Sequence, residues 1–268
     1  MQLNNGIDIP QLGFGVWQVP PDETAAAVTT ALETGYRSID TAAGYQNEAG
    51  VGAAVKASGL PRDELFITTK LANPDQGYDT ALRAFDASLA QLGLEHVDLY
   101  LIHWPTPARD LYVDTWRALS KLYADGRVRA IGVSNFLPEH LERLAGLGGV
   151  VPAVNQIELH PALQQREIQE ANAKLGIATE AWSPLARSTI LKDPAIAAIA
   201  SAHDRTPAQV VIRWHLQQGR IVIPKSVTPS RIRENFAVTG FDLTDDEIAT
   251  IDGLENDGRT GPNPATFN

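Results

Sequence analysis

The chain has 268 residues, of which 44% are hydrophobic and 20% are charged, and it contains no cysteine. This length and composition are typical of a globular protein with a sizeable core, and the lack of cysteine excludes disulfides, thiolate nucleophiles and cysteine metal sites. The formal net charge of −10 argues against a general binder of nucleic acid or of anionic membranes, so any anionic ligand must meet local positive charge.

The N-terminal segment is expected to form a small β-hairpin. Asn5-Gly6 lies between the apolar residues Leu3 and Ile7, and Asn-Gly favours a two-residue hairpin turn. The first residues lack the basic start and apolar run of a secretory signal, and no apolar stretch is long enough to span a bilayer. Together with the missing cysteines, these features predict a cytoplasmic protein without a membrane partner.

Short apolar runs alternate with helical patterns along the rest of the chain. Strands are predicted at residues 12–16, 36–40, 65–70, 97–103, 128–133, 153–157, 177–182 and 220–224. Helices are predicted at about 22–35, 47–58, 78–92, 111–123 and 165–174, and from Pro138, Thr206, Thr228 and Thr244 onwards. The starts at Thr206 and Thr244 carry capping-box residues, a glutamine or glutamate three positions later.

Eight strand–helix units in sequence predict parallel strands joined by right-handed crossovers. We see no linker that would divide them, so residues 1–268 are expected to form a single domain. A closed (β/α)8 TIM barrel fits this length and count best, and an open doubly wound sheet is the alternative. The tail from Asp257 is rich in glycine and proline and is expected to be irregular.

Polar residues stand at the end of almost every predicted strand, where the active site of such a barrel lies. Asp40, Lys70 and His103 end three of these strands, and Tyr45 lies in the loop after Asp40. Each has a structural explanation when taken alone: a turn cap for the aspartate, a solvated strand end for the lysine, a half-buried core position for the histidine. The convergence of all four at one rim favours a functional site.

Several kinds of chemistry have little support. There is no Gly-x-Ser-x-Gly elbow for a serine hydrolase. His103 and His160 do not form a zinc-binding pair, so no metal site is predicted. Glu180 could join Asp40 as a glycosidase pair, but it lies two residues short of the rim.

The remaining set suits proton transfer to an oxygen atom. A free tyrosine has a pKa of about 10, which a neighbouring ammonium lowers, and a carboxylate keeps that ammonium charged. A neutral histidine can donate a hydrogen bond to a carbonyl oxygen. Tyr45 is therefore a candidate proton donor in a carbonyl reduction, and the hydride must come from a cofactor.

Five motifs give the chain a clear resemblance to the aldo-keto reductases, close to the bacterial branch that includes 2,5-diketo-D-gluconate reductase. The motifs are GYRSIDTA at 35–42, LIHWP at 101–105, IGVSNF at 131–136, NQIELHP at 155–161 and IPKS at 223–226. The resemblance runs from about Leu12 to Asp252.

The resemblance implies a monomeric barrel that reduces aldehydes and ketones with NADPH. It makes Tyr45 the general acid, Lys70 and Asp40 its tuning pair, and His103 the residue that orients the carbonyl. The contacts implied for the nicotinamide and pyrophosphate are Ser134, Asn135, Gln156, Trp182, Ser183 and Leu185.

A basic cluster on this acidic chain is the candidate site for the cofactor's 2′-phosphate. Lys225 and Ser226 precede a helix that carries Arg231, and a helix start with nearby cations binds phosphate. A solvated, charged helix start is the alternative. By resemblance the cofactor contacts here are Lys225, Ser226, Val227, Thr228 and Arg231, with Glu234 and Asn235 near the adenine. This cluster predicts NADPH rather than NADH.

The substrate side of the pocket is expected to have Trp17 and Trp104 as apolar walls, together with His103. Ala72 stands where the bacterial relatives often have tryptophan, which predicts an open pocket and a broad range of carbonyl substrates. An alternative function is an NADPH-binding barrel with a regulatory or structural role, and a metal-dependent hydrolase is a third.

Overall fold

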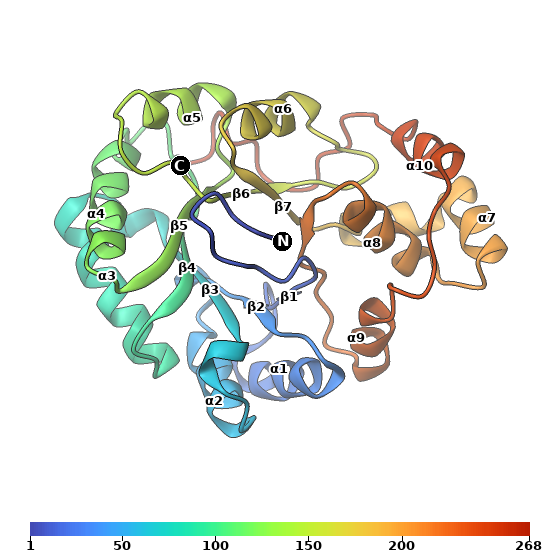
Figure 1. Cartoon of the computed structure of the whole chain (residues 1–268), viewed down its shortest axis with the longest axis horizontal. Coiled ribbons are helices and arrows are strands. Elements are labelled where there is room, and N and C mark those ends of the chain that lie inside the picture. Colours follow the sequence, from blue (N-terminus) through green and yellow to red (C-terminus); the bar gives the residue numbers. More distant parts are fainter.

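Eight parallel strands form one sheet in chain order in the computed structural model, which describes residues 1–268 (Figure 1). The strands are β1 (Phe14–Gly15), β2 (Ser38–Asp40), β3 (Phe66–Leu71), β4 (Val97–Ile102), β5 (Val128–Ser134), β6 (Val154–Glu158), β7 (Ala178–Trp182) and β8 (Ile221–Val222). A parallel bridge between Leu12 and Val222 joins the last strand to the first. The sheet is thus closed into the predicted barrel, and the open-sheet alternative is wrong.

Ten helices surround the strands (Figure 1). They are α1 (Pro21–Thr34), α2 (Glu48–Ala57), α3 (Tyr78–Leu92), α4 (Tyr112–Ala124), α5 (Pro138–Ala145), α6 (Arg166–Lys174), α7 (Pro194–Ala202), α8 (Pro207–Gln217), α9 (Pro229–Phe236) and α10 (Asp245–Asp252). Both predicted capping boxes are present, at the starts of α8 and α10. The sequence prediction missed α7, whose start is marked by Asp193 accepting a hydrogen bond from the Ala195 amide.

The N-terminal segment closes the amino end of the barrel. Its expected hairpin is reduced to one antiparallel bridge between Gln2 and Asp8. Leu3 and Ile9 are buried against strand residues such as Leu99, and the N-terminus lies over the middle of the ring of strands in Figure 1. The barrel therefore opens towards ligands only at the other end, where the strands finish.

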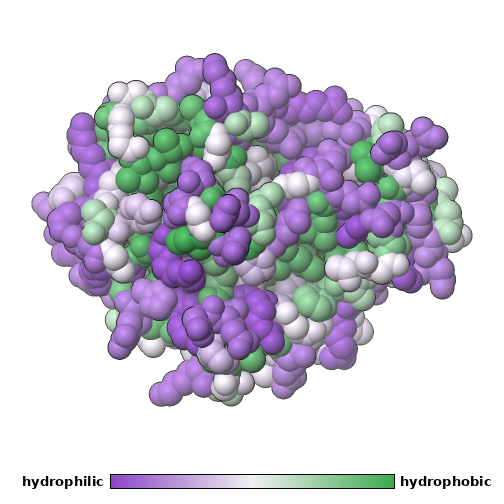
Figure 2. Space-filling view, viewed as in Figure 1, coloured by the Kyte–Doolittle hydropathy of each residue, from purple (hydrophilic) through white to green (hydrophobic).

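The largest hydrophobic core lies between the barrel and the helices α1 to α5, and a second one packs under α7, α8 and α10. Hydrophilic residues dominate the face shown in Figure 2, with smaller hydrophobic areas between them. No helix has the length and apolar character needed to cross a bilayer. The tail after α10 is irregular, as predicted, and runs back across the carboxyl ends of the strands.

Candidate active site

A cavity of about 360 Å³ lies at the carboxyl ends of the strands. The structure brings most of the predicted site residues into its wall. These are Trp17, Asp40, Tyr45, His103, Trp104, Ser134, Asn135, Gln156, Trp182, Ser183 and Lys225. Lys70 does not line the cavity, because it is fully buried beneath it.

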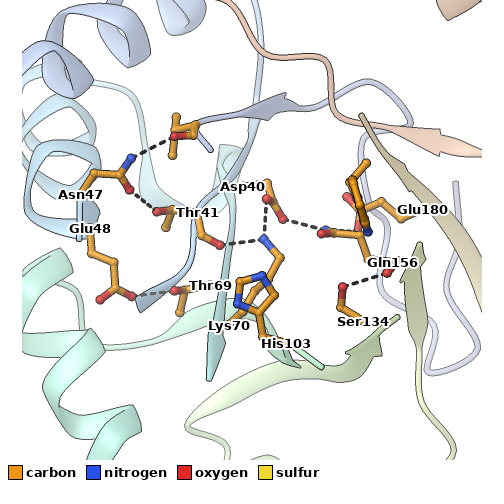
Figure 3. A network of polar contacts seen from close by, with 12 residues as sticks. Asp40, Thr41, Asn47, Glu48, Thr69, Lys70, His103, Ser134, Gln156 and Glu180 are labelled. Atoms are coloured by element: carbon orange, nitrogen blue, oxygen red, sulfur yellow. Dashed lines mark hydrogen bonds and ion pairs between the residues drawn. The ribbon is translucent and has the colours of Figure 1, made fainter. Parts of the chain in front are cut away.

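A buried ion pair supports the floor of the cavity (Figure 3). Lys70 Nζ donates to Asp40 Oδ1 at 2.6 Å and to the Thr41 carbonyl at 2.9 Å. The same nitrogen lies 5.1 Å from the centre of the Tyr45 ring. Burial alone would lower the pKa of Lys70, but the Asp40 carboxylate raises it above its ordinary value. Lys70 is therefore a fixed positive charge beside Tyr45.

The loop after β2 holds Tyr45 at the cavity. Tyr45 ends a single 3₁₀ turn, Ala43–Tyr45, and is half-buried. The Asn47 side chain anchors this loop, because it donates to the Val16 carbonyl at 2.9 Å and accepts from the Thr41 hydroxyl at 2.8 Å. The tyrosine is thus held by buried hydrogen bonds on both sides of the turn.

Burial raises the pKa of the Tyr45 hydroxyl above its ordinary value, and the charge of Lys70 lowers it only in part. The sequence argument considered the lysine alone and expected a lowered pKa, which the structure corrects. A raised pKa keeps the hydroxyl protonated at neutral pH, and it can then act as a proton donor.

The His103 ring lies edge-on to the Tyr45 ring in the cavity wall. The two rings have centroids 5.5 Å apart and planes at 72°. Burial, helped by the charge of Lys70, lowers the pKa of His103 to about 3. The imidazole is therefore neutral at neutral pH, and a neutral ring can donate one hydrogen bond to an oxygen held next to Tyr45.

Next to His103, the wall is a series of hydrogen-bonded polar groups. Ser134 Oγ donates to the Gln156 carbonyl at 2.8 Å. Asn135 Nδ2 donates to the His103 carbonyl at 3.0 Å, and Asn135 Oδ1 accepts from Trp182 Nε1 at 2.9 Å. These bonds fix the Trp182 ring and the side chains of Ser134 and Asn135, two of the polar groups predicted to meet the nicotinamide.

Glu180 is a buried carboxyl in β7, two residues short of the rim as the sequence analysis expected. Gln156 Nε2 donates to Asp40 Oδ2 at 2.8 Å and to Glu180 Oε2 at 3.1 Å, so one amide group holds two carboxyl groups (Figure 3). Burial and the nearby charge of Asp40 raise the pKa of Glu180 to about 8. Glu180 does not line the cavity, which leaves the glycosidase pair without support.

The predicted phosphate residues lie beyond the cavity, with Lys225 at the boundary. Lys225 is exposed and lines the cavity wall, and the Thr228 amide donates to Ser226 Oγ at 3.1 Å just before α9. The remaining predicted contacts are outside the cavity wall: Leu185, Ser226, Val227, Thr228, Arg231, Glu234 and Asn235.

The C-terminal tail supplies a wall that the sequence analysis missed. Phe267 lines the cavity and packs on Trp104, with ring centroids 4.6 Å apart. Pro262 and Arg187 also line the cavity, and the Arg187 guanidinium lies 5.1 Å from the Trp17 ring centre. The tail and Arg187 therefore add walls to a pocket that was expected to be open, and Ala72 does not line it. In the sequence, the only sign of this wall was Phe267, a single aromatic residue near the end of a glycine- and proline-rich tail.

No group of three or more histidine, aspartate or glutamate side chains is placed to hold a metal ion. The closed barrel brings together at its carboxyl end the tyrosine, lysine, aspartate and histidine that the resemblance to the aldo-keto reductases implies for an oxidoreductase.

Comparison with known sequences agrees with this class. The sequence profile of the Aldo/keto reductase family matches residues 11–256, and the chain belongs to that family. An aldo-keto reductase from Mycolicibacterium smegmatis is 57% identical over 99% of this chain and 97% of its own length. Methylglyoxal reductase DkgA from Yersinia pestis is 54% identical, covering 100% and 96%. Morphine 6-dehydrogenase from Pseudomonas putida is 50% identical, covering 98% and 94%.

Solved structures show the same fold. A crystal structure of a variant of Gox0644 in complex with NADPH has a TM-score of 0.96 and 52% sequence identity, covering 100% of this chain and 98% of that one. An aldo-keto reductase from Bombyx mori in complex with NADP has a TM-score of 0.91 and 35% identity, covering 97% and 93%.

Proposed function

We propose that the chain reduces small aldehydes and ketones to alcohols, with Tyr45 as the proton donor and His103 as the group that orients the carbonyl oxygen. The observation that carries this proposal is the buried Asp40–Lys70 pair directly beside the Tyr45 ring. The chain is an NADPH-dependent oxidoreductase by family, and bound NADPH supplies the hydride.

The cavity wall fits a nicotinamide ring. Trp182 presents a fixed aromatic face, while Asn135 and Gln156 offer amide groups beside it. Lys225 and Arg231 would hold the 2′-phosphate outside the cavity. Trp182, Asn135 and Gln156 line the same cavity as Tyr45 and His103, where a carbonyl carbon must lie to be reduced.

The protein's own contribution is the proton. Tyr45 remains protonated at neutral pH because burial raises the pKa of its hydroxyl. Once the hydroxyl proton has moved to the carbonyl oxygen, the positive charge of Lys70 stabilises the phenolate that remains. Asp40 keeps Lys70 charged and in place, and neutral His103 holds the oxygen by a hydrogen bond.

We propose a range of small carbonyl and dicarbonyl substrates. The names of two close relatives, a methylglyoxal reductase and a morphine 6-dehydrogenase, support chemistry on carbonyl and alcohol groups of different sizes. The aromatic walls Trp17 and Trp104 accept apolar groups without specific polar recognition. On the family resemblance, we also propose that the protein is active as a monomer, which a size measurement alongside the assay tests.

Loss of NADPH absorbance with methylglyoxal tests the proposal. Tyr45→Phe keeps the ring but removes the proton, and we expect kcat to fall by roughly 10²–10⁴-fold with NADPH binding retained. Tyr78→Phe is the matched control, because Tyr78 is an exposed tyrosine on α3. A Tyr45→Phe variant as active as wild type would remove Tyr45 as the donor. NADPH binding without turnover of any carbonyl would favour a regulatory barrel.

A further inference from the structure

One buried carboxylate holds the C-terminal tail to the barrel at Thr260 and Gly261. Glu158, the last residue of β6, is fully buried. Its Oε1 accepts a hydrogen bond from the Thr260 amide at 2.7 Å and another from the Thr260 hydroxyl. Its Oε2 accepts from the Gly261 amide at 3.0 Å. His160 Nε2 lies 3.2 Å from Oε1. Just before Thr260, the Gly258 amide donates to the Ala162 carbonyl at 2.7 Å. Arg259 donates to Gln165 Oε1 at 3.1 Å and lies 3.9 Å from Glu158 Oε2.

This carboxylate is negatively charged in the folded protein. Burial alone would raise the pKa of Glu158, but the bonds from His160, Thr260 and Gly261 lower it to about 2. A buried anion is tolerated only while it has hydrogen-bond donors. Because three of these donors belong to the tail, release of the tail leaves the charge largely unsatisfied.

The tail presses on the active site immediately after this anchor. A Cβ atom on Gly261 would lie 2.4 Å from Trp182 Cη2 and 3.1 Å from Glu158 Oε2. No side chain fits there, so the tail backbone lies directly on the edge of the Trp182 ring. Pro262 follows and lines the cavity.

Beyond Gly261 the tail has only one further hydrogen bond to the rest of the chain. The amides of Thr266 and Phe267 bond within the tail, to the Asn263 carbonyl. At the chain end, Asn268 Oδ1 accepts from the Ala108 amide at 2.7 Å in an exposed contact. Phe267 is thus placed against Trp104 by the segment from Thr260 to Asn268, which has one buried polar anchor, at Glu158, and one exposed anchor, at Ala108.

We propose that Glu158 is a positioning residue for the substrate pocket: it latches the tail across the carboxyl end of the barrel, so that Phe267 and Trp104 together bind an apolar group beside the carbonyl. The selectivity part of this inference rests on the proposed function. The latch itself does not, because it concerns only contacts within the chain.

Glu158→Gln tests the latch with little change of shape. The amide keeps one acceptor oxygen but turns a nitrogen donor towards groups that are themselves donors. We expect the amide protons of Thr260 and Gly261 to exchange with solvent at least about tenfold faster, because charge-assisted hydrogen bonds are lost. Glu142→Gln removes the same charge from an exposed position on α5 and should leave this exchange unchanged.

The preference of the pocket for an apolar group is measured with phenylglyoxal and methylglyoxal, two dicarbonyls that differ by an aromatic ring. The measure is the ratio of kcat/KM for phenylglyoxal to kcat/KM for methylglyoxal. We expect Glu158→Gln to lower this ratio by about tenfold, mainly through KM for phenylglyoxal. Phe267→Ala should have the same effect, and the double variant should show no further loss, because both changes remove one wall.

Three outcomes overturn the inference: unchanged exchange at Thr260 and Gly261 in Glu158→Gln, an unchanged selectivity ratio, or additive losses in the double variant. If Glu158→Gln does not fold, Thr260→Val removes only the hydroxyl donor. It is tested by the same amide exchange and the same kcat/KM ratio. A wild-type chain that reduces no carbonyl contradicts the proposed function, whereas the exchange measurement still decides the latch.

Discussion

At the residue scale, the site depends on how burial changes each titratable group. The sequence located Asp40, Tyr45, Lys70 and His103 because each one follows a strand at the same rim of a barrel. It did not show that burial outweighs the lysine in setting the pKa of Tyr45, since burial is a property of the packed fold. The sequence analysis did not single out Glu158, because its bonds to the distant residues Thr260 and Gly261 exist only in the folded chain. Glu180 gave no rim signal, because it lies inside a strand.

The neutral state of His103 can be tested by titration. With a pKa of about 3 in the folded chain against 6.5 ordinarily, the unfolded state binds more protons between these two values. His103 therefore lowers stability as the pH falls from 6.5 towards 3, and contributes no such change above 6.5. We expect its ring NMR signals, assigned by their loss in His103→Gln, to stay constant from pH 8 to pH 5. A shift centred near pH 6.5 would contradict a buried, neutral imidazole.

The roles of Lys70 in stability and in catalysis can be tested separately. Lys70→Met leaves Asp40 as a buried charge without its partner, and we expect a loss of about 3–5 kcal/mol in the free energy of unfolding. Activity should fall as well, because no cation remains beside Tyr45. Adding Asp40→Asn removes the unpaired charge, so urea unfolding should show part of the stability regained, while the carbonyl assay stays low. Equal recovery of both would mean that the lysine acts only on folding.

At the element scale, regular features were predicted well and irregular ones poorly. Helix α8 and helix α10 were placed by their caps, which are local signals in the sequence. Helix α7 was missed because its apolar pattern lies in the long connection after β7, where one helix per unit was expected. The N-terminal hairpin is smaller than predicted, since Leu3 and Ile9 gain more by packing into the end of the barrel than by extending a ladder.

The cap of α10 should contribute stability without affecting catalysis. Thr244 Oγ1 accepts from the Glu247 amide at 3.3 Å, and Glu247 Oε2 accepts from the Thr244 amide at 2.8 Å. We expect Thr244→Ala to lower the free energy of unfolding by about 1 kcal/mol, measured in urea, with kcat unchanged. Thr250→Ala is the control, because Thr250 lies within the helix and bonds only to the Asp246 carbonyl. An equal loss of unfolding free energy in Thr250→Ala would mean that the effect comes from helix propensity and not from the cap.

At the scale of the whole molecule, the charge balance decides how an acidic chain holds an anionic cofactor. The formal net charge is −10, so the mean field around the protein repels phosphate. Lys225, Arg231 and Arg233 are exposed and form no ion pair within the chain. Their charges are therefore available to a ligand, whereas most other arginines are paired with aspartate or glutamate.

A charge deletion on α9 tests whether this cluster selects NADPH. Arg231→Gln removes one cation proposed to meet the 2′-phosphate, and a charge-assisted contact of about 1.4 kcal/mol corresponds to a tenfold change in Kd. We expect the Kd for NADPH to rise about tenfold and that for NADH, which lacks the phosphate, to stay the same. Arg233→Gln is the matched control, because it lies two residues further along α9 and therefore points away from Arg231. Fluorescence titration at low and high salt distinguishes a direct phosphate contact from a general effect of charge. A general effect would weaken NADPH binding equally in both variants, and the loss would fade as salt is added. A phosphate contact makes Arg231→Gln the weaker binder of NADPH at each salt concentration.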